Sequence, residues 1–507
     1  MQSEGDGITN ATDRRVRTSP WLEGLKRHDP EVTYVSICVA NWTEEIGKAI
    51  GSSPFLKDLT IWLNGSDHNW VQGVCRWLPR NRSIETLKFV EESASVFDDR
   101  DIFSCLALFI KKNKKFRNIK FHCDNRSFWT IDSIVKALSS CSEGQLERIQ
   151  LSGFRCTDEK AARFIDSLNK HVGLLKLSIP DLFDNTNHDN DADEEYRDRA
   201  YDALANLLEN PASKIQKLRV RPDFEIMEIL SHALIENNSL TSLDLSSGFI
   251  THDFLAVLAH PLCSLEKLIM IGPVEFYDED IACLGNALAV NNKLMHLQYH
   301  GHNNITEIGW GAFSNCLRSS KSALEVLDLG QSLINDENAS IIISALAINS
   351  CLQILHMNRQ ISFATKSRVW EVLSRTLCDM SSIDSIAFSS NHTLHTCPQY
   401  APKDVVSLLE MNKHESNAGS ARRKILKYKL SEGKSYIHAF AQMPEAVLPC
   451  AIGWVGRDRH GYSAMYNLLR CLPSLVCGSC SNRCNDAAGT KKRKLLCTRT
   501  TDTNTIV

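Results

Sequence analysis

A six-position pattern, apolar-x-x-apolar-x-apolar, recurs thirteen times and constrains the fold of this 507-residue chain more than any other feature. The clearest copy reads Leu240-x-x-Leu243-x-Leu245. Successive copies are about 29 residues apart, with one longer insertion, and a fixed period of this length is typical of solenoid repeats. The copies begin at Val32, Leu56, Ile84, Phe116, Leu146, Leu174, Ile215, Leu240, Leu265, Leu294, Leu324, Leu352 and Ile383.

Each copy predicts a short strand that is followed by a helix. The last two apolar positions are two residues apart, so they share one face of a strand. Stretches such as residues 281–288 and 339–347 have apolar residues at helical spacing, with Asp or Asn at the expected helix starts. One strand–helix unit cannot bury its apolar face alone, so stacking is required. The predicted fold class is an α/β solenoid with a parallel inner sheet and outer helices.

These copies resemble the leucine-rich repeat family, specifically its long, ribonuclease-inhibitor-like subtype, over residues 32–390. The resemblance implies a horseshoe-shaped solenoid of about 13 repeats. The alternative is a set of unrelated amphipathic segments in another α/β fold. The family usually places Asn or Cys three residues after the third apolar position, where these residues form a hydrogen-bonded ladder. We expect that ladder to be absent or replaced, because the positions hold Phe154, Gly248, Pro273, His302, Ser332 and Gln360.

Composition and the end of the repeat pattern divide the chain into four regions. Residues 1–30 are polar and are predicted to form a flexible lead, and residues 31–397 form the solenoid. An open solenoid end exposes its core, so residues 398–476 are interpreted as a helical C-terminal cap or as a docking segment. Residues 477–507 contain few large apolar side chains and are predicted to be a disordered tail rich in cysteine and basic residues.

The predicted cap opens with a basic amphipathic helix at residues 420–431. Apolar segments follow in residues 435–476, and they contain the motif VLPxAIxWxGRDxxGxSxxYxLLRxxPSL. This order is similar to the C-terminal segment of uncharacterised leucine-rich-repeat proteins of diatoms. The likeness implies no particular chemistry.

The long insertion between Leu174 and Ile215 is rich in Asp and Glu. Its stretch Asp189-x-Asp191-x-Asp193 matches the start of a calcium-binding loop. Such a loop needs a glycine and a closing glutamate, but Glu194 and Ala200 stand at those places. We therefore expect a solvated acidic loop.

The overall charge and hydropathy exclude several classes of protein. Lys plus Arg number 57 and Asp plus Glu 60, so the net charge is −3, unlike that of a dedicated nucleic-acid binder. The sequence contains no run of eighteen apolar residues, so no membrane span is predicted. The polar start predicts no signal peptide, which favours the cytoplasm or the nucleus and mostly reduced thiols for the 18 cysteines. Several of these thiols are predicted at core positions, among them Cys263, Cys283 and Cys351.

The sequence contains no complete catalytic motif, so the chain is predicted to be neither an enzyme nor a cofactor-binding protein. Gly433-Lys434-Ser435 resembles the end of a phosphate-binding loop, but Tyr428 stands where the first glycine belongs. Cysteines of the tail have the spacing of zinc ligands, but the second matched pair that a zinc site needs is missing. Two alternatives for these cysteines remain open: unmodified thiols, and acylation beside the basic run 491–494. These weak metal candidates are Cys477, Cys480 and Cys484.

The x positions of the copies are predicted to face the concave side of the sheet. The first seven copies carry eight basic side chains there against three acidic ones, whereas the last six carry one basic and five acidic. Such a gradient would orient a charged partner, although a solvated face with unrelated charges remains the alternative. The predicted partner-binding residues are Lys57, Lys88, Arg117, Lys120, Arg148, Lys176, Lys217, Arg219, Asp244, Glu325 and Asp328.

The predicted inner face spans roughly 55–60 Å at the usual strand spacing. A surface of that length suits a folded protein better than a small molecule. The sequence therefore predicts a non-catalytic scaffold that binds another protein along its concave strands. The alternative is a GTPase-activating regulator similar to the leucine-rich-repeat activator of the Ran GTPase, with Arg76 or Arg82 in a strand-to-helix loop as the acting residue.

Overall fold

A computed structural model of the chain forms two compact units, residues 1–377 with 391–414 and residues 378–390 with 415–507. The structure describes residues 20–63, 69–91, 99–123, 131–142, 144–154, 156–182, 194–221, 224–246, 250–272, 276–301, 305–330, 332, 334–357, 368–397, 401–413, 416–425 and 427–428.

The first unit is built on one parallel sheet of twelve strands, whose order in space is their order in the chain. The strands are β1 (Tyr34–Cys38), β2 (Asp58–Trp62), β3 (Thr86–Glu91), β4 (Asn118–Cys123), β5 (Arg148–Ser152), β6 (Lys176–Ile179), β7 (Lys217–Val220), β8 (Ser242–Ser246), β9 (Lys267–Ile271), β10 (His296–His300), β11 (Val326–Leu329) and β12 (Ile354–Met357). Twelve of the thirteen predicted copies therefore contain a strand.

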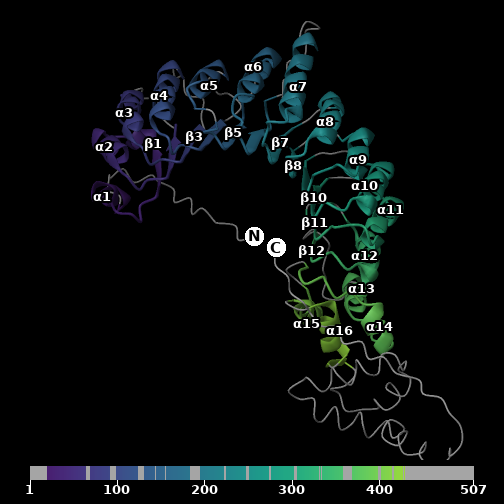
Figure 1. Cartoon of the computed structure of the whole chain (residues 1–507). Helices are drawn as coiled ribbons and strands as arrows, with labels where there is room; N and C mark the ends of the chain where they lie inside the picture. The colour runs from purple at the N-terminus through teal and green to yellow at the C-terminus, as the bar shows by residue number, and fades with distance from the viewer. Residues whose placement is uncertain are drawn as a thin grey trace, which may run out of the picture. The chain divides into compact units, whose positions relative to one another are not determined.

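A helix or helical turn follows each strand on the outer side of the sheet (Figure 1). The helices of the first unit are α1 (Pro20–Lys26), α2 (Glu44–Ser52), α3 (Asn69–Trp77), α4 (Asp99–Lys112), α5 (Ile131–Leu138), α6 (Asp158–Leu168), α7 (Glu194–Glu209), α8 (Phe224–Glu236), α9 (His252–Ala259), α10 (Asp278–Val290), α11 (Glu307–Arg318), α12 (Asp336–Ala345), α13 (Arg368–Leu377) and α15 (Lys403–Asn412). Short 3₁₀ turns are η1 (Val39–Asn41), η2 (Leu78–Arg80) and η4 (Leu346–Ile348). The helices predicted around residues 281–288 and 339–347 are confirmed, and they begin at Asp278 and Asp336. The fold is a leucine-rich-repeat solenoid.

The core lies between the sheet and the helices. All three apolar positions of the second to twelfth copies are buried, which is why the pattern recurs. In the first copy Val35 and Ile37 are buried and Val32 is half-buried. Aromatic side chains connect neighbouring repeats near β4. Phe121 stacks on Phe89 with ring centroids 5.4 Å apart, and it meets Phe154 edge-on at 6.0 Å. Each buried aromatic side chain contributes about 2–3 kcal/mol of transfer free energy.

Buried asparagines form a ladder at the turn from helix to strand, three residues before the first apolar position. The Asn237 amide donates to the Leu208 carbonyl of the preceding repeat at 2.6 Å, and its oxygen accepts the Leu240 N–H at 2.7 Å. The same arrangement recurs at Asn81, Asn291, Asn349 and Asn391. Asn113 likewise donates to a carbonyl of the preceding repeat, but its oxygen accepts the Lys115 N–H. A ladder is thus present, but at another position from the one that the family pattern predicts.

The thirteenth predicted copy, which begins at Ile383, is wrong. Residues Ile383–Phe388 form helix α14 in the second unit, and the Phe388 side chain is 69% exposed. The sheet continues instead through Leu394, which is fully buried, and Thr396, which pairs with Ile354. Asn391 supplies the ladder contact of this repeat, whereas nothing equivalent precedes Ile383 among the described residues.

The boundaries of the solenoid also differ from the prediction. Helix α1 lies within the predicted flexible lead, and its Leu22 and Leu25 are buried. At the other end, α15 lies beyond residue 397, yet the Asn412 amide donates to the Leu394 carbonyl at 2.7 Å, as the Asn113 amide does to the Ile84 carbonyl. The ladder therefore extends the array into the predicted cap.

Several other predictions fall partly within the described residues. Helix α7 begins at Glu194, so the end of the predicted acidic loop is helical. Cys263 is buried, while Cys283 and Cys351 are only half-buried. In the second unit, helix α16 (Asn417–Ile425) covers the start of the predicted basic helix.

Lys424 of α16 is not on a solvated basic face. Its side chain is fully buried, and burial lowers its pKa to about 7, against the opposing charge of Cys378. Several predicted features lie outside the described residues: the remainder of the predicted cap, the diatom-like motif at residues 435–476, the tail cysteines and most of the acidic insertion.

Candidate protein-binding surface

The parallel register arranges the outward side chains of β2–β12 in two rows that cross the inner face of the sheet. We call them the first row and the second row, after the order of the residues within each strand. The first row contains Asp58, Thr86, Asn118, Arg148, Lys176, Lys217, Ser242, Lys267, His296, Val326 and Ile354. The second row contains Thr60, Lys88, Lys120, Gln150, Ser178, Arg219, Asp244, Ile269, Gln298, Asp328 and His356.

Six cations lie in the two rows on β3–β7, and the five other than Arg219 form what we call the basic cluster. Lys88 and Lys120 are neighbours in the second row. Arg148, Lys176 and Lys217 are consecutive in the first row. Adjacent strands are about 4.8 Å apart, so like charges face one another at short range.

Electrostatics shows how closely these charges act on one another. Burial, then Arg148 and then Lys88 lower the pKa of Lys120, against a smaller opposing effect of Asp58. Burial, Arg148, Lys217 and Lys120 lower the pKa of Lys176. Each lysine is therefore less favourable in its charged form than in water, and an anion on the cluster would relieve that cost.

Every position of both rows on β3–β7 carries a side-chain hydrogen-bond donor, and none is Asp or Glu. The neutral members are Thr86, Asn118, Gln150 and Ser178. The Arg148 Nε and Ser178 Oγ atoms are buried and have no hydrogen-bond partner among the residues that the structure describes. Two such donors beside the lysines fit an acceptor-rich ligand.

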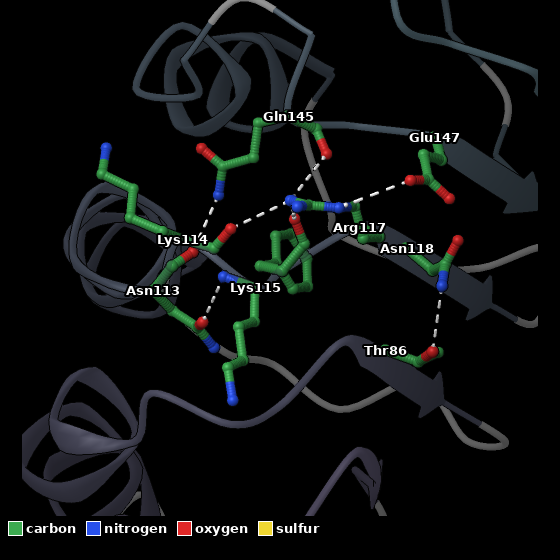
Figure 2. Close-up of polar contacts among 9 residues, drawn as sticks. Thr86, Asn113, Lys114, Lys115, Arg117, Asn118, Gln145 and Glu147 are labelled. Carbon is green, nitrogen blue, oxygen red and sulfur yellow. Dashed lines mark hydrogen bonds and ion pairs between the residues drawn. The ribbon is translucent and has the colours of Figure 1, made fainter.

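Three of the predicted partner-binding residues lie in the turns before the strands instead of in the two rows. Lys57, Arg117 and Glu325 each precede the first strand residue, and their carbonyls accept two N–H groups of the next repeat. In Figure 2 the Arg117 guanidinium donates to the Lys114 and Gln145 carbonyls and lies 3.4 Å from the Glu147 carboxylate. Arg117 therefore stabilises its own turn.

The other eight predicted residues lie in the two rows, where the structure brings six of them together on β3–β7: Lys88, Lys120, Arg148, Lys176, Lys217 and Arg219. Arg219 is offset by Asp244 of β8, with Nε and Oδ2 3.5 Å apart. The charge gradient along the sheet is accordingly a basic cluster followed by a nearly neutral half.

The nearly neutral half carries histidines that the charge count did not single out. His300, which is 9% exposed, places its Nε2 atom 3.2 Å from Asp328 Oδ1, and the Gly330 N–H donates to the same oxygen at 2.9 Å. Burial raises the Asp328 pKa, but the hydrogen bonds from His300 and Gly330 and the charges of His300 and His356 together lower it. Aligning the copies in register would have revealed this group.

The two arginines of the GTPase-regulator alternative do not occupy a strand-to-helix loop. Arg76 lies in the last turn of α3, where it pairs with Glu44 at 3.2 Å. Arg82 lies in the turn into β3 and donates to the Pro79 carbonyl at 2.9 Å. That part of the prediction is wrong, because the strand-to-helix connection of this repeat ends before Asn69.

Two further features bear on the surface. Within the described ranges, no three His, Cys, Asp or Glu side chains are grouped so that they could hold a metal ion. None of the helices in these ranges combines the length and the apolar character that crossing a membrane requires.

No protein-family model matches the chain. Over 262 residues, the chain is 23% identical to mouse (Mus musculus) "NACHT, LRR and PYD domains-containing protein 14". The match covers 50% of this chain, and it spans only 25% of that protein.

Among solved structures, the chain is similar to the leucine-rich repeat-containing protein LegL7 from Legionella pneumophila. The sequence identity is 13% and the TM-score is 0.35. The alignment covers 61% of this chain and 96% of LegL7.

Proposed function

We propose that this chain is a non-catalytic scaffold that binds another protein across the inner face of its solenoid. The observation that supports the proposal is the basic cluster, because neither of the two rows carries an acidic residue on the five adjacent strands β3–β7. Like charges on neighbouring strands destabilise a sheet. An anionic partner bound over the basic cluster would offset this repulsion, which would explain why the cations are placed together. The inner face is also long enough for a standard protein–protein interface.

We further propose that the solenoid belongs to the long, ribonuclease-inhibitor-like subtype. Its outer elements support this, because full helices such as α4, of 14 residues, and α7, of 16 residues, follow the strands. A location in the cytoplasm or the nucleus and the lack of a nucleic-acid partner complete the proposal. The near-balanced charge supports the second point.

A comparison of matched charge reversals would test the scaffold function. The inner variant carries Lys88→Glu, Lys120→Glu and Lys176→Glu. The outer variant carries three reversals of exposed lysines on the helix side, Lys48→Glu, Lys136→Glu and Lys170→Glu. Both variants and the unmodified full chain would be used to purify partners from the native cell, with quantitative mass spectrometry at two salt concentrations.

The proposal expects that a defined set of proteins is retained by the unmodified chain and the outer variant but lost by the inner variant. Retention should weaken as salt rises, because the contact is electrostatic. Partners that the inner variant retains as well as the outer variant does would reject binding on the inner face.

A further inference from the structure

We infer that the partner segment taken by the basic cluster is phosphorylated and lies extended across β3–β7, with two or three phosphoryl groups set against the cations. This inference rests on the proposed function, because it specifies the chemistry of the partner that the inner face binds. Three properties of the cluster carry it.

The first property is the uniform hydrogen-bond character of the cluster. All ten side chains of the two rows on β3–β7 are donors, and the buried Arg148 Nε and Ser178 Oγ have no partner among the described residues. A phosphoryl group presents three strong acceptor oxygens, and guanidinium and ammonium groups bind it with charge-assisted hydrogen bonds. The cations and the two unpartnered donors therefore favour a ligand that is rich in acceptor oxygens.

The second property is the density of positive charge. From β3 to β7 the sheet spans four gaps of about 4.8 Å, or roughly 19 Å, and alternate side chains of an extended segment repeat every ~6.6 Å. About three partner side chains can therefore face the cluster. Three carboxylates would carry a charge of about −3, whereas two or three phosphoryl groups carry about −3 to −6. The five cations thus fit phosphoryl groups better.

The third property is the way in which the cluster ends. Asp58 on β2 stands beside Thr86 in the first row, and Asp244 on β8 stands beside Arg219 in the second row. These carboxylates confine the favourable field to β3–β7, so the phosphoryl groups have to lie within that length. A segment of roughly six extended residues matches it.

Single-stranded nucleic acid is the competing phosphate-bearing ligand, and the rows do not favour it. Binding of single strands combines basic grooves with aromatic side chains on which the bases stack. None of the ten positions of the two rows on β3–β7 is aromatic. The net charge of −3 is also unlike that of a nucleic-acid binder.

The experiment measures binding of the full chain to four fluorescein-labelled probes by fluorescence anisotropy. Three probes are ten-residue Gly/Ser-based peptides with phosphoserine, glutamate or serine at three alternate positions. The fourth is a ten-nucleotide oligothymidylate. The protein variants are Lys120→Gln with Lys176→Gln and, as the matched control, Lys48→Gln with Lys136→Gln.

We expect the phosphoserine peptide to bind at least about tenfold more tightly than the glutamate peptide and the oligothymidylate. The Lys120/Lys176 double variant should lose at least tenfold in affinity for it, and the control variant less than twofold. Equal binding of glutamate and phosphoserine peptides, tighter binding of oligothymidylate, an equal loss in the control, or no binding of the phosphoserine peptide would each overturn the inference.

These outcomes separate the inference from the function on which it rests. If the glutamate peptide binds as tightly and still depends on Lys120 and Lys176, the phosphate requirement fails and binding of an acidic protein stands. Failure of the proposed function is read from the partner purification, where the inner variant would retain its partners.

Discussion

Arg219 on β7 and Asp244 on β8 are register neighbours, and the guanidinium Nε lies 3.5 Å from the carboxylate Oδ2. The two side chains are 46% and 21% exposed, so water screens the pair and its contribution to stability is small. The position of this ion pair matters more for the charge of the inner face than its strength does for stability. Asp244 offsets the sixth cation of the inner face and thereby ends the basic field at β8.

Replacement of Asp244 by Asn should therefore strengthen binding of the triphosphoserine peptide. Removing one carboxylate at the border takes away a negative charge that offsets Arg219, so we expect a two- to fivefold gain in affinity in low salt, on the order of 0.4–1 kcal/mol. Raising the salt concentration to about 1 M should abolish the gain. Fluorescence anisotropy measures it, with exposed Asp253→Asn on α9 as the control. An unchanged affinity would mean that the pair does not border the binding site.

The lysines of the basic cluster should lower the stability of the folded chain. Burial and neighbouring cations lower the Lys120 pKa, so its charged form costs free energy in the folded state. For a lysine with a lowered pKa, this cost is present at neutral pH and disappears as pH rises through the folded pKa towards 10.5.

We therefore expect Lys120→Gln to raise the melting temperature at pH 7, by on the order of 1 °C. The rise should shrink in high salt, where repulsion is screened. Differential scanning calorimetry measures it. Lys267→Gln is the control, since Lys267 stands in the first row between Ser242 and His296. A fall in the melting temperature for Lys120→Gln would contradict mutual repulsion.

Most of the fold could be predicted because the determinants are local and repeated. In the first twelve copies every apolar position except Val32 is buried, so twelve strands follow directly from the spacing. The prediction of the last repeat was wrong because Ile383-x-x-Ile386-x-Phe388 has the same apolar spacing as a strand copy but lies on a helix. Ser382 begins that helix by accepting the Ser385 N–H at 2.9 Å.

The candidate site was predicted in part for a similar reason. Spacing alone cannot separate the x position before each strand from the two within it, so Lys57, Arg117 and Glu325 were grouped with the two rows. The backbone carbonyls at those positions accept the N–H groups of the next repeat, which places them in turns. The gathering of cations and hydrogen-bond donors on β3–β7 depends on the register between strands, which no single copy contains.

The buried asparagine ladder should be a major source of stability. Asn237 is 4% exposed and bonds to the Leu208 carbonyl and to the Ser239 and Leu240 N–H groups. Asn237→Ala leaves these groups buried without partners, so we expect a loss of about 2–4 kcal/mol in urea unfolding. The adjacent Asn238 is exposed, and Asn238→Ala should cost less than about 0.5 kcal/mol. Equal effects of the two substitutions would show that the ladder does not stabilise the array.

The position of the last repeat can be tested by two truncations of large apolar side chains. Leu394 is fully buried, so Leu394→Ala should cost about 2–5 kcal/mol. Phe388 is 69% exposed, so Phe388→Ala should change stability by about 0.5 kcal/mol or less. Urea unfolding followed by circular dichroism measures both. The opposite order would restore the copy that begins at Ile383.

The Asp328 carboxylate should make the nearly neutral half of the sheet sensitive to acid. Burial raises its pKa, but His300, the Gly330 N–H and His356 together bring it below the ordinary value of 3.8. A carboxyl group with a lowered pKa contributes stability above its unfolded pKa, and it loses that contribution as pH falls through the folded pKa. The acid-sensitive window therefore lies below 3.8.

Asp328→Asn should accordingly destabilise the chain by on the order of 1 kcal/mol at pH 7, and the difference from the unmodified chain should narrow below the ordinary pKa. Urea titrations at pH 7, 5 and 3 measure the narrowing. Exposed Asp202→Asn on α7 serves as the control and should stay within about 0.5 kcal/mol of the unmodified chain at each pH. A difference for Asp328→Asn that is equally large at pH 3 and pH 7 would exclude its ionised carboxylate as the stabilising group. The loss at pH 7 would then come from packing around His300.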